Sequence, residues 1–435
     1  MNRRSLHASI NGTLVGTLAE TNNLWSFQYV SAWINNPKAF ALSPHLPLAS
    51  NRQLDGASTR PVQWYFDNLL PEEGQRVLLA ADAKISISDA FGLLEWYGAE
   101  SAGSLTLHAP GFMPDAAQAS RVLTNQALEL RIKQLPTIPL THGAIKRMSL
   151  AGAQHKLAII MQDGVLLEPV GATASTHILK PDHPNLDYSH SVINEWFVMR
   201  LAQRMGLVVP DVDRRYMPSP IYIIDRFDRE LNPNGWTRRH AIDACQLLGL
   251  DRSFKYSQGS TKTLGKLANA CRSPAVARTR LFEWLVFNVL VGNADAHLKN
   301  LSFVVSTEGI ELAPFYDLLS TASYESVAFD KQGWPTQTQL AWPILGVSHF
   351  HQVNRNLLLQ AAAELNLSSV TAQRLLDNLR KRIMQQAAKL NTEFELANAI
   401  LLRARPELSA TFAGESRCLR VIEHTIIKDM VFRVA

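Results

Sequence analysis

The sequence predicts an α+β protein in which a small N-terminal α+β domain precedes two lobes, the first rich in strands and the second helical. Strand–turn–strand patterns surround Asn11-Gly12 and Asp163-Gly164, two pairs that favour tight hairpin turns. A proline-containing stretch at 109–145 lies between these two hairpins and marks a domain boundary. Helical patterns dominate from about Ala241 onward. A strand-rich lobe followed by a helical lobe suggests a cleft between them.

The N-terminal domain contains one hairpin and at least two helices by these criteria. Asn11-Gly12 predicts a type I′ turn between strands at 5–10 and 13–18, because both residues tolerate positive φ angles. Pro61 is well placed to begin a helix, since proline suits the first helical position. Ser88 is the expected cap of a second, apolar helix.

The two lobes are predicted from a change of pattern after the proline-containing stretch. In chain order, the expected elements are strands Leu157–Met161, Val165–Pro169 and Thr176–Lys180, helix Ser189–Met205, strand Ile221–Phe227, and a later hairpin of Leu301–Ser306 with Ile310–Pro314. The expected domains are the N-terminal domain at 1–108, a linker region at 109–145, the β-rich lobe at 146–228 and the helical lobe at 229–435. One short helix near Ala127–Gln134 is expected inside the linker region.

Composition excludes several classes of protein. Forty-three Lys and Arg residues against 38 Asp and Glu residues leave a net charge of +5, which is too small to indicate a nucleic-acid partner by itself. Three cysteines without a CxxC pair exclude a disulfide scaffold and a cysteine zinc site, and favour a reducing cytosol. Arg3-Arg4 is not followed by the apolar segment of a signal peptide. Leu281–Val291 is too short to span a membrane. We therefore expect a cytoplasmic protein.

Three polar residues of the helical lobe have the spacing of a phosphotransferase site. Asp295 and Asn300 form a D-x-x-x-x-N pattern after an apolar helix, and Asp317 follows the next hairpin. Phosphoryl transfer from ATP needs one carboxylate for the acceptor hydroxyl, and an amide oxygen with a second carboxylate for magnesium. The alternative is that Asp295 and Asn300 cap turns and that Asp317 caps a helix beginning at Leu318. All three residues occurring in order favours the phosphotransferase interpretation.

Two further residues of the loop between Asp295 and Asn300 are candidates for binding phosphate. His297 and Lys299 could each contact phosphate or stabilise the loop, although a lone histidine is more often structural. A metal-hydrolase pair of His297 with Asp295 is conceivable, but no third histidine stands at ligand spacing.

The β-rich lobe offers a candidate phosphate loop and a candidate ion pair. The loop before its first strand contains Ala151, Gly152, Ala153, Gln154, His155 and Lys156, after Ser149. Its small residues let backbone N–H groups approach phosphates, yet it lacks the Walker A pattern and alone would be an ordinary loop. Lys180 at a strand end and Glu195 on the following helix match the ATP-positioning ion pair of kinases, with a surface salt bridge as the alternative. Asp225 and Phe227 end the last strand, where an adenine base would bind, or simply end that strand.

These motifs together resemble the HipA family of bacterial toxin kinases over nearly the whole chain. In the N-terminal part the resemblance rests on Gly12–Leu14, Phe27–Tyr29, Asn68–Pro71 and Gly98–Gly103. In the remainder it rests on Ser149–Lys156, His177–Lys180, Asn194-Glu195, Asp225–Arg229, Asp243–Gln246, Gly292–Asn300 and Pro314–Asp317. The resemblance implies a two-lobed, phosphoinositide-kinase-like serine/threonine protein kinase carrying a HipA N-terminal domain.

The resemblance also implies roles for individual residues. Asp295 would be the catalytic aspartate, Asn300 and Asp317 the magnesium ligands, and Lys180 the lysine that contacts ATP phosphates. The backbone at Asp225 and Phe227 would contact adenine; relatives commonly have glutamate at the Asp225 position. His155 stands at a variable place in the loop, and neither departure threatens ATP binding.

Members of this family autophosphorylate a loop serine that corresponds to Ser149. About two added negative charges where the ATP phosphates must bind would eject the loop and inactivate the kinase. The alternative is an unmodified loop serine.

The resemblance further implies a cellular role. Family members phosphorylate aminoacyl-tRNA synthetases, notably the glutamyl enzyme, and so inhibit translation and arrest growth. A helix-turn-helix antitoxin, HipB, neutralises them and represses the operon. Two other functions stay open from the residues: a small-molecule kinase of the aminoglycoside or choline type, which uses a similar D-x-x-x-x-N…D arrangement, and a non-enzymatic module of an antitoxin–operator complex. The chain has no recognisable helix-turn-helix of its own, so contact with DNA would be indirect.

Overall fold

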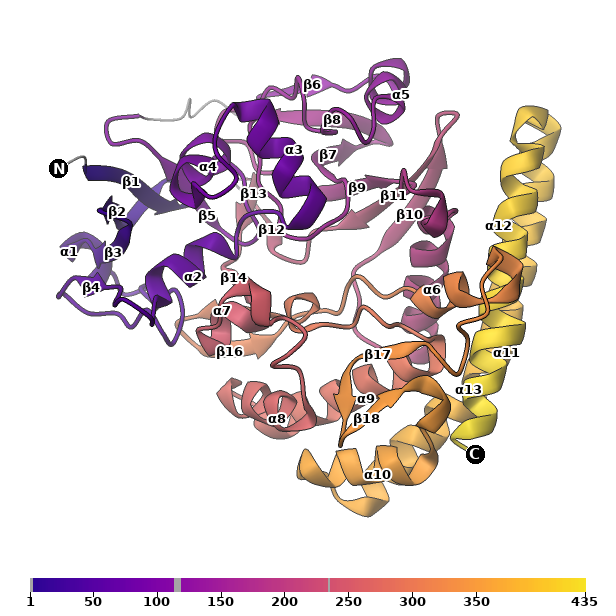
Figure 1. The fold of residues 1–435 in the computed structure, drawn as a ribbon. Helices are drawn as coiled ribbons and strands as arrows, with labels where there is room; N and C mark the ends of the chain where they lie inside the picture. The colour runs from indigo at the N-terminus through magenta and orange to yellow at the C-terminus, as the bar shows by residue number, and fades with distance from the viewer. Residues whose placement is uncertain (1–2, 113–118, 234) are drawn as a thin grey trace. The chain divides into compact units, whose positions relative to one another are not determined.

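The computed structural model describes residues 3–112, 119–233 and 235–435, so residues 113–118 of the predicted linker region lie outside the described residues (Figure 1). The chain divides into two compact units. The first unit comprises the described residues of 1–180, 223–255 and 302–313. The second unit comprises 181–222, 256–301 and 314–435.

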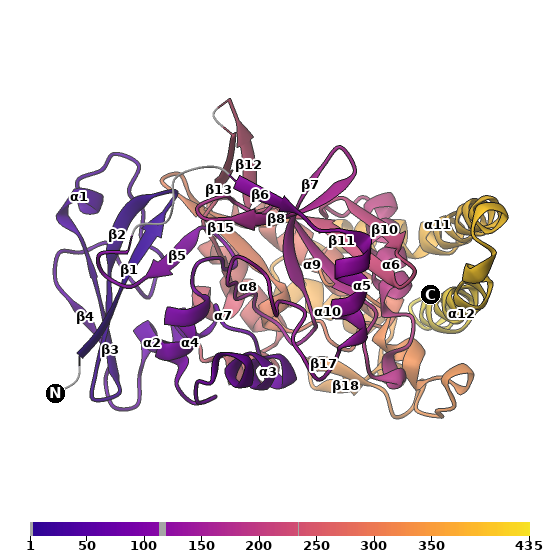
Figure 2. The same cartoon turned by 90° about the horizontal axis from the view of Figure 1, so that it is seen from above.

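A five-stranded antiparallel sheet forms the N-terminal part of the first unit, in the order β4-β3-β2-β1-β5 (Figure 2). Its strands are β1 (Arg3–Ile10), β2 (Thr13–Thr21), β3 (Leu24–Tyr29), β4 (Gln53–Leu54) and β5 (Leu105–His108). Ile10 pairs with Thr13, and Asn11 and Gly12 between them have φ angles of 49° and 81°. The predicted hairpin with two positive φ angles is confirmed.

Short helices pack beside this sheet: α1 (Ser31–Ile34), α2 (Pro61–Asp67), α3 (Glu73–Ala83) and α4 (Ala90–Tyr97). The rings of Trp25 and Phe91, from β3 and α4, meet edge-on at 5.2 Å, so aromatic packing closes this core. Pro61 occupies the first turn of α2 as predicted. The prediction that Ser88 caps α4 is wrong, because the side chain of Asp89 accepts the N–H of Gly92 at 3.0 Å.

A second sheet of the first unit contains the predicted hairpin around Asp163-Gly164. Its strands within this unit follow the order β9-β7-β8-β6. They are β6 (Ala119–Val122), β7 (Leu157–Gln162), β8 (Val165–Val170) and β9 (His177–Pro181). Ile160 pairs with Leu167 across the hairpin, as expected. Strand β6 and helix α5 (Asn125–Lys133) lie within the 109–145 stretch, where only one short helix was expected.

The remaining elements of the first unit are small. They are β12 (Arg229–Asn232), β13 (Gly235–Arg238), β14 (Ala241–Asp243), α7 (Ala244–Leu248), β15 (Ser302–Ser306) and β16 (Gly309–Leu312). Strands β14, β15 and β16 form a three-stranded sheet, which includes the second predicted hairpin. Strand β11 (Pro220–Asp225) carries the chain from the second unit into the first.

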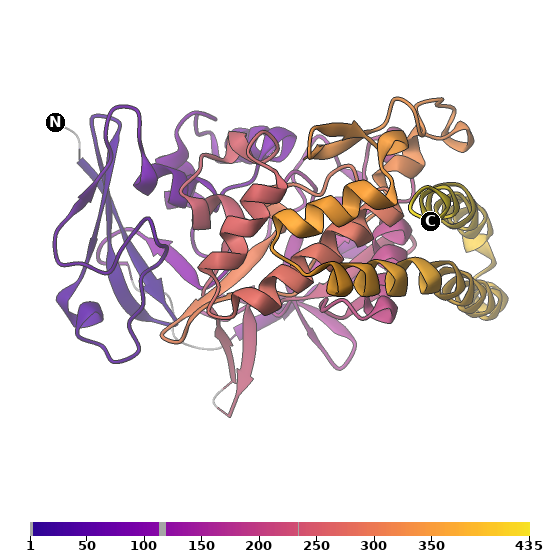
Figure 3. The same cartoon turned by 90° about the horizontal axis from the view of Figure 1, so that it is seen from below.

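Helices dominate the second unit, as predicted. They are α6 (Ser191–Met205), α8 (Thr261–Ala270), α9 (Pro274–Val291), α10 (Arg355–Glu364), α11 (Ser369–Ala404), α12 (Ser409–Val421) and α13 (Lys428–Arg433). Helix α9 is the central element, with α8, α11 and α13 packed against it (Figures 1 and 3). Its side chains are buried on most sides, including Phe282, Leu285 and Phe287. A largely buried helix gives the loop at its C-terminal end a rigid support.

The second unit also contains strands that are not expected from the sequence. Besides β10 (Val212–Tyr216), strands β17 (Gln339–Ile344) and β18 (Val347–His349) form a two-stranded sheet. Across the described ranges, no helix is both long enough and apolar enough to cross a membrane.

Candidate active site

The predicted site residues are divided between the two units, and those of the second unit lie around the end of helix α9. Gly292 ends this helix with a left-handed φ of 67°, and the N–H of Asn293 bonds back to the carbonyl of Asn288 at 2.9 Å, a Schellman-type end. A Cβ at Gly292 would lie 2.6 Å from Cγ2 of Ile426 and 2.8 Å from Cβ of Ala322. Both the backbone conformation and the available space therefore require glycine here.

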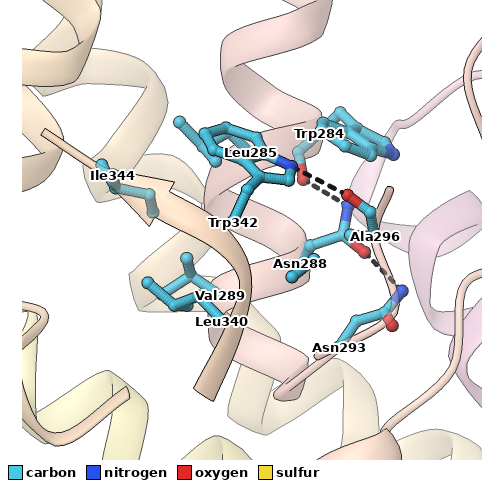
Figure 4. A pocket seen from close by; sticks show the side chains of 10 residues that line it. Trp284, Leu285, Asn288, Val289, Asn293, Ala296, Leu340, Trp342 and Ile344 are labelled. Atoms are coloured by element: carbon cyan, nitrogen blue, oxygen red, sulfur yellow. Dashed lines mark hydrogen bonds between the residues drawn. The ribbon is translucent and has the colours of Figure 1, made fainter. Parts of the chain in front are cut away.

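Asn293 holds three segments of the second unit together. Its Nδ2 donates to Oδ1 of Asn288 at 2.7 Å and to the carbonyl of Asp317 at 3.4 Å. Its Oδ1 accepts the N–H of Asp295 at 3.0 Å. Nδ2 of Asn288 donates in turn to the carbonyl of Trp284 at 2.8 Å (Figure 4). Side-chain amides thus connect helix α9 with both segments that carry the candidate carboxylates.

Asp295 presents its carboxylate to solvent, with a side chain that is 47% exposed. The hydroxyl of Tyr256 donates to its Oδ1 at 2.5 Å, and Nε2 of His297 lies 4.0 Å from the same oxygen. The rings of Tyr256 and His297 meet edge-on, with centroids 5.0 Å apart. An accessible carboxylate of this kind can accept a proton from an incoming hydroxyl.

Asn300 and Lys299 lie in the short 3-10 turn η3 (Leu298–Asn300), and both are buried. Nδ2 of Asn300 donates to the carbonyl of Asp295 at 2.9 Å. Because the nitrogen end of this amide is bound to the loop, its oxygen is the end suited to a cation. The hydroxyl of Tyr316 donates to the carbonyl of Lys299 at 3.0 Å, which connects this turn with the segment of Asp317.

Asp317 adopts a left-handed φ of 52°, and the chain from 313 to 320 has no regular secondary structure. The alternative that Asp317 caps a helix beginning at Leu318 is therefore wrong. Asp317 is half-buried within this irregular segment.

The segment after Asp317 is fixed by two polar side chains. Nδ2 of Asn194 donates to the carbonyl of Ser320 at 3.0 Å, and Oδ1 of Asn194 accepts its N–H at 2.7 Å. Oγ1 of Thr321 accepts the N–H of Ala294 at 2.6 Å and donates to the carbonyl of Gly292 at 3.3 Å. The segment is therefore joined both to helix α6 and to the loop that carries Asp295.

Glu195 lies on helix α6 and is buried, as expected for a residue of a helix that faces a core. Burial raises the pKa of the Tyr222 phenol well above its usual value, and the carboxylates of Glu195 and Asp317 raise it further. Both carboxylates therefore lie near the same buried phenol within the second unit. The pairing of Glu195 with Lys180 stays a prediction.

The residues of the first unit begin with the loop that contains Ser149. This serine is fully buried, its N–H donates to the carbonyl of Glu100 at 2.7 Å, and its hydroxyl donates to the carbonyl of Leu69 at 2.8 Å. Nδ1 of His155, also buried, lies 2.8 Å from Nε2 of Gln75. Residues of the N-terminal domain therefore hold this loop in place.

Gly152 lies in the middle of the loop with a φ of 106°, a conformation that favours glycine. Its carbonyl accepts the N–H of Glu72 at 3.3 Å, next to a bridge between Gly152 and Pro71. Nζ of Lys156 donates to the carbonyl of Ala151 at 2.6 Å and so closes the loop on itself. Within this loop Ala153 is exposed, whereas Gln154 is half-buried.

Glu100 is the centre of a buried charge cluster in the first unit. Its carboxylate lies within 3.3 Å of four cations, which are Lys146, Arg226, Arg229 and Arg238. Burial alone would raise the pKa of Glu100, but these positive charges outweigh it and hold that pKa well below its usual value. Asp228 supplies a second carboxylate at 2.7 Å from Arg226. The cluster joins Glu100, whose carbonyl holds Ser149, to the segment that follows Asp225.

Lys180, Asp225 and Phe227 also belong to the first unit. Lys180 lies in β9 and is buried, whereas the side chain of Asp225 is 52% exposed at the end of β11. Oδ1 of Asp225 lies 2.9 Å from Nε2 of His177, and Phe227 follows in a turn. Strand β11 therefore ends at Asp225, two residues before the expected end at Phe227, and adenine binding by this backbone stays a prediction.

Four residues that support the candidate site residues were not predicted from the sequence to have a role: Tyr256, Asn194, Asn293 and Glu100. Asn194, Asn293 and Glu100 stand inside motifs that supported the resemblance, so a polar residue in an apolar surrounding was the available signal. Tyr256 stands far from Asp295 in the sequence and carried no signal. Within the described ranges, no group of three or more His, Cys, Asp or Glu side chains is placed to hold a metal ion.

Two family models match the chain: the HipA N-terminal domain at 6–108 and the HipA-like C-terminal domain at 148–387. Y4mE of Sinorhizobium fredii, whose name describes a kinase, is 35% identical over 343 residues, which cover 75% of this chain and 80% of that protein. The serine/threonine-protein kinase toxin HipA of Shewanella oneidensis is 32% identical over 349 residues, which cover 75% of this chain and 77% of that toxin.

A solved structure agrees with these relatives. The complex of a Shewanella oneidensis HipA with HipB and its operator DNA contains a chain that matches with a TM-score of 0.75 at 27% identity, covering 98% of this chain and 99% of that one. The α+β fold predicted from the sequence is confirmed by this match. The chain therefore belongs to the HipA family and is a HipA-like serine/threonine-protein kinase toxin.

Proposed function

We propose that this kinase transfers the γ-phosphoryl group of ATP to serine or threonine, with Asp295 as its catalytic aspartate and Asn300 and Asp317 as its magnesium ligands. The observation that carries the proposal is the connected arrangement around Asn293, which joins the segments of Asp295 and Asp317 by hydrogen bonds. Such an arrangement fixes one carboxylate for the acceptor and another for a cation.

Each residue has a defined task in this proposal. Asp295 orients the acceptor hydroxyl and accepts its proton as the phosphoryl group is transferred, an effect on the order of 10²–10⁴ in rate. Lys180 contacts the phosphates and Glu195 holds that lysine in place. The backbone at Asp225 and Phe227 binds adenine, while residues 151–156, His297 and Lys299 surround the phosphates.

The residues present fit magnesium and ATP by their chemistry. One amide oxygen, at Asn300, and one carboxylate, at Asp317, are a sparse set of ligands, which is usual for magnesium because substrate phosphates and water supply the rest. Magnesium bound there would neutralise charge on the phosphates. The small side chains at 151–153 leave backbone N–H groups accessible to phosphate.

Autophosphorylation at Ser149 is part of the proposal. The buried hydroxyl of Ser149 donates to the carbonyl of Leu69. The loop must therefore move out of this buried position before Ser149 can be phosphorylated. A phosphate on Ser149 would place about two negative charges in a fully buried position, which prevents the loop from returning. The kinase would thereby inactivate itself.

The proposed partners follow from the relatives. The HipA of the matching structure is bound to HipB and operator DNA, and we propose a HipB-like helix-turn-helix antitoxin for this chain, with DNA contacted indirectly. The proposed target is an aminoacyl-tRNA synthetase, the glutamyl enzyme first, whose phosphorylation would inhibit translation and arrest growth.

Intact mass after incubation with Mg-ATP tests the kinase assignment. Wild type should gain one phosphate, whereas Asp295→Asn and Ser149→Ala should gain none. Asp330→Asn, at an exposed position of the same unit, is the matched control and should behave as wild type. Phosphate gained by Asp295→Asn would exclude Asp295 as the catalytic residue. Turnover of ATP with an aminoglycoside and no modified protein would favour the small-molecule alternative.

A further inference from the structure

An open pocket of about 520 Å³ lies beside Tyr256 and Ala294 in the second unit. Tyr256, which bonds to Asp295, and Ala294, its neighbour in the chain, line this pocket. The rest of its lining is Glu325 and the stretch 337–341, which leads into strand β17. Its volume lies in the range of ligand-binding pockets, and it is connected to Asp295 through Tyr256, which lines it and bonds to that carboxylate.

The wall formed by β17 is fixed to the catalytic loop. Nε1 of Trp342 donates to the carbonyl of Ala296 at 3.0 Å, and the indole lies against helix α9 in the small apolar cavity of Figure 4. Leu340 and Ala341 line both that cavity and the open pocket. A molecule bound along this wall would therefore be held at a fixed distance from Asp295.

The charge of the lining favours a cationic occupant. Among the described residues that line the pocket, Glu325 is the charged one. Its side chain is 40% exposed, and its Oε1 lies 3.3 Å from Nζ of Lys331, whose side chain is 35% exposed. An incoming cation can displace Lys331 from such a partly exposed pair at low cost. The segment before Ser149 carries such cations at three and two positions before the serine: Lys146, which is bound to Glu100 until the loop moves out, and Arg147.

We propose that this acceptor pocket, formed by Tyr256, Ala294, Glu325 and residues 337–341, binds the protein segment that carries the phosphorylated hydroxyl. Glu325 selects segments with Lys or Arg two or three residues before that hydroxyl, and residues 143–154 of this chain are one such segment. In the transfer, the hydroxyl oxygen forms a bond to the γ-phosphorus, the bond from this phosphorus to ADP breaks, and the proton passes to Asp295. The inference rests on the phosphoryl transfer proposed above.

Tyr256 acts as a gate in this arrangement. Its hydroxyl donates to the same carboxylate that must accept the hydrogen bond of the substrate hydroxyl. The phenol is partly exposed and can turn outward when a segment enters the pocket. The free kinase thus keeps Asp295 paired until an acceptor displaces the phenol.

Binding of a peptide without ATP tests the pocket independently of catalysis. A fluorescent peptide of residues 143–154 and its charge-reversed form, with Lys146→Glu and Arg147→Glu, are titrated against the full chain and followed by anisotropy. Wild type should bind the basic peptide about two- to fivefold more tightly, the range of one exposed ion pair. Glu325→Lys should reverse this preference and Glu325→Gln should abolish it.

Glu395→Lys, on an exposed position of helix α11, is the matched control and should bind both peptides as wild type does. Thermal melting checks that each variant is folded. Equal binding of both peptides by wild type, no binding of either, or an unchanged preference in Glu325→Lys would overturn the proposal. Phosphorylation of kanamycin without peptide binding would assign the pocket to small cationic molecules instead. The mass assay separates these outcomes from a failure of the kinase assignment, because peptide binding does not require ATP.

Discussion

The side-chain amide of Asn194 binds both backbone groups of Ser320, donating to its carbonyl at 3.0 Å and accepting its N–H at 2.7 Å. Both residues are fully buried. This two-point contact fixes the chain three residues after Asp317 to helix α6, the helix that also carries Glu195. Asn194 therefore links the orientation of that helix to the proposed magnesium ligand.

Replacing Asn194 should affect both stability and the response to magnesium. Asn194→Ala leaves two buried backbone groups without this partner and should lower the free energy of unfolding by about 1–3 kcal/mol. The looser Asp317 segment should raise the magnesium concentration needed for half-maximal autophosphorylation. A melting curve and a magnesium titration measure the two effects. Lost stability with an unchanged magnesium response would show that Asn194 has a structural role alone.

Gly292→Ala should destabilise the second unit strongly. Alanine at a left-handed φ of 67° is strained, and its Cβ would make two contacts below 3.0 Å. Together these effects should lower the free energy of unfolding by about 2–4 kcal/mol. Gly265→Ala is the matched control, because a Cβ there meets no atom within 4 Å and alanine favours the helix. Melting temperatures of both variants against wild type check this. Equal melting of the two variants would contradict the steric argument.

Removal of the Tyr256 hydroxyl should favour acceptor binding. Tyr256→Phe keeps the ring against His297 but cannot donate to Asp295, so the acceptor no longer competes with the phenol. We expect kcat/KM for peptide 143–154 to rise about threefold, within the range of one modest hydrogen bond, while KM for ATP stays unchanged. Steady-state kinetics with each substrate varied separately measure this. A fall in kcat would mean that Tyr256 positions Asp295 rather than gating it.

Glu415 should make the stability of the chain depend on pH. Burial raises its pKa to about 7, although the hydroxyl of Tyr216, which donates at 2.8 Å, and the charge of Arg214 partly oppose the shift. Because the folded-state pKa lies above the ordinary value of 4.5, the neutral acid favours folding, and this stability is lost as pH rises from about 4.5 through 7.

The neutral variant Glu415→Gln should therefore match wild type near pH 5 and exceed its stability by about 2 kcal/mol near pH 8. Glu395→Gln, at an exposed position, should show no such difference. Denaturant unfolding at several pH values measures it. A difference in stability between Glu415→Gln and wild type that is largest at acid pH would contradict the raised pKa of Glu415.

The sequence by itself determined the local elements and the family. Asn11-Gly12 and Asp163-Gly164 fix hairpins through backbone preferences that need no distant partner. The apolar pattern of residues 281–291 similarly predicts a buried helix, and the motifs from Ser149 to Asp317 identify the HipA family. Where local signals competed, as at Ser88 and Asp89, the choice of cap depended on side-chain geometry.

The tertiary structure decided which distant residues meet. Tyr256 reaches Asp295 across 39 positions and Asn194 reaches Ser320 across 126, and no local pattern encodes either contact. Glu100 likewise acquires its four cations from segments up to 138 residues away. Local preferences act over a few residues, whereas these hydrogen bonds exist because packing brings remote backbone together and buried polar groups must find partners there. Sequence reasoning could therefore name the candidate catalytic residues, but only the folded chain shows what holds each of them in place.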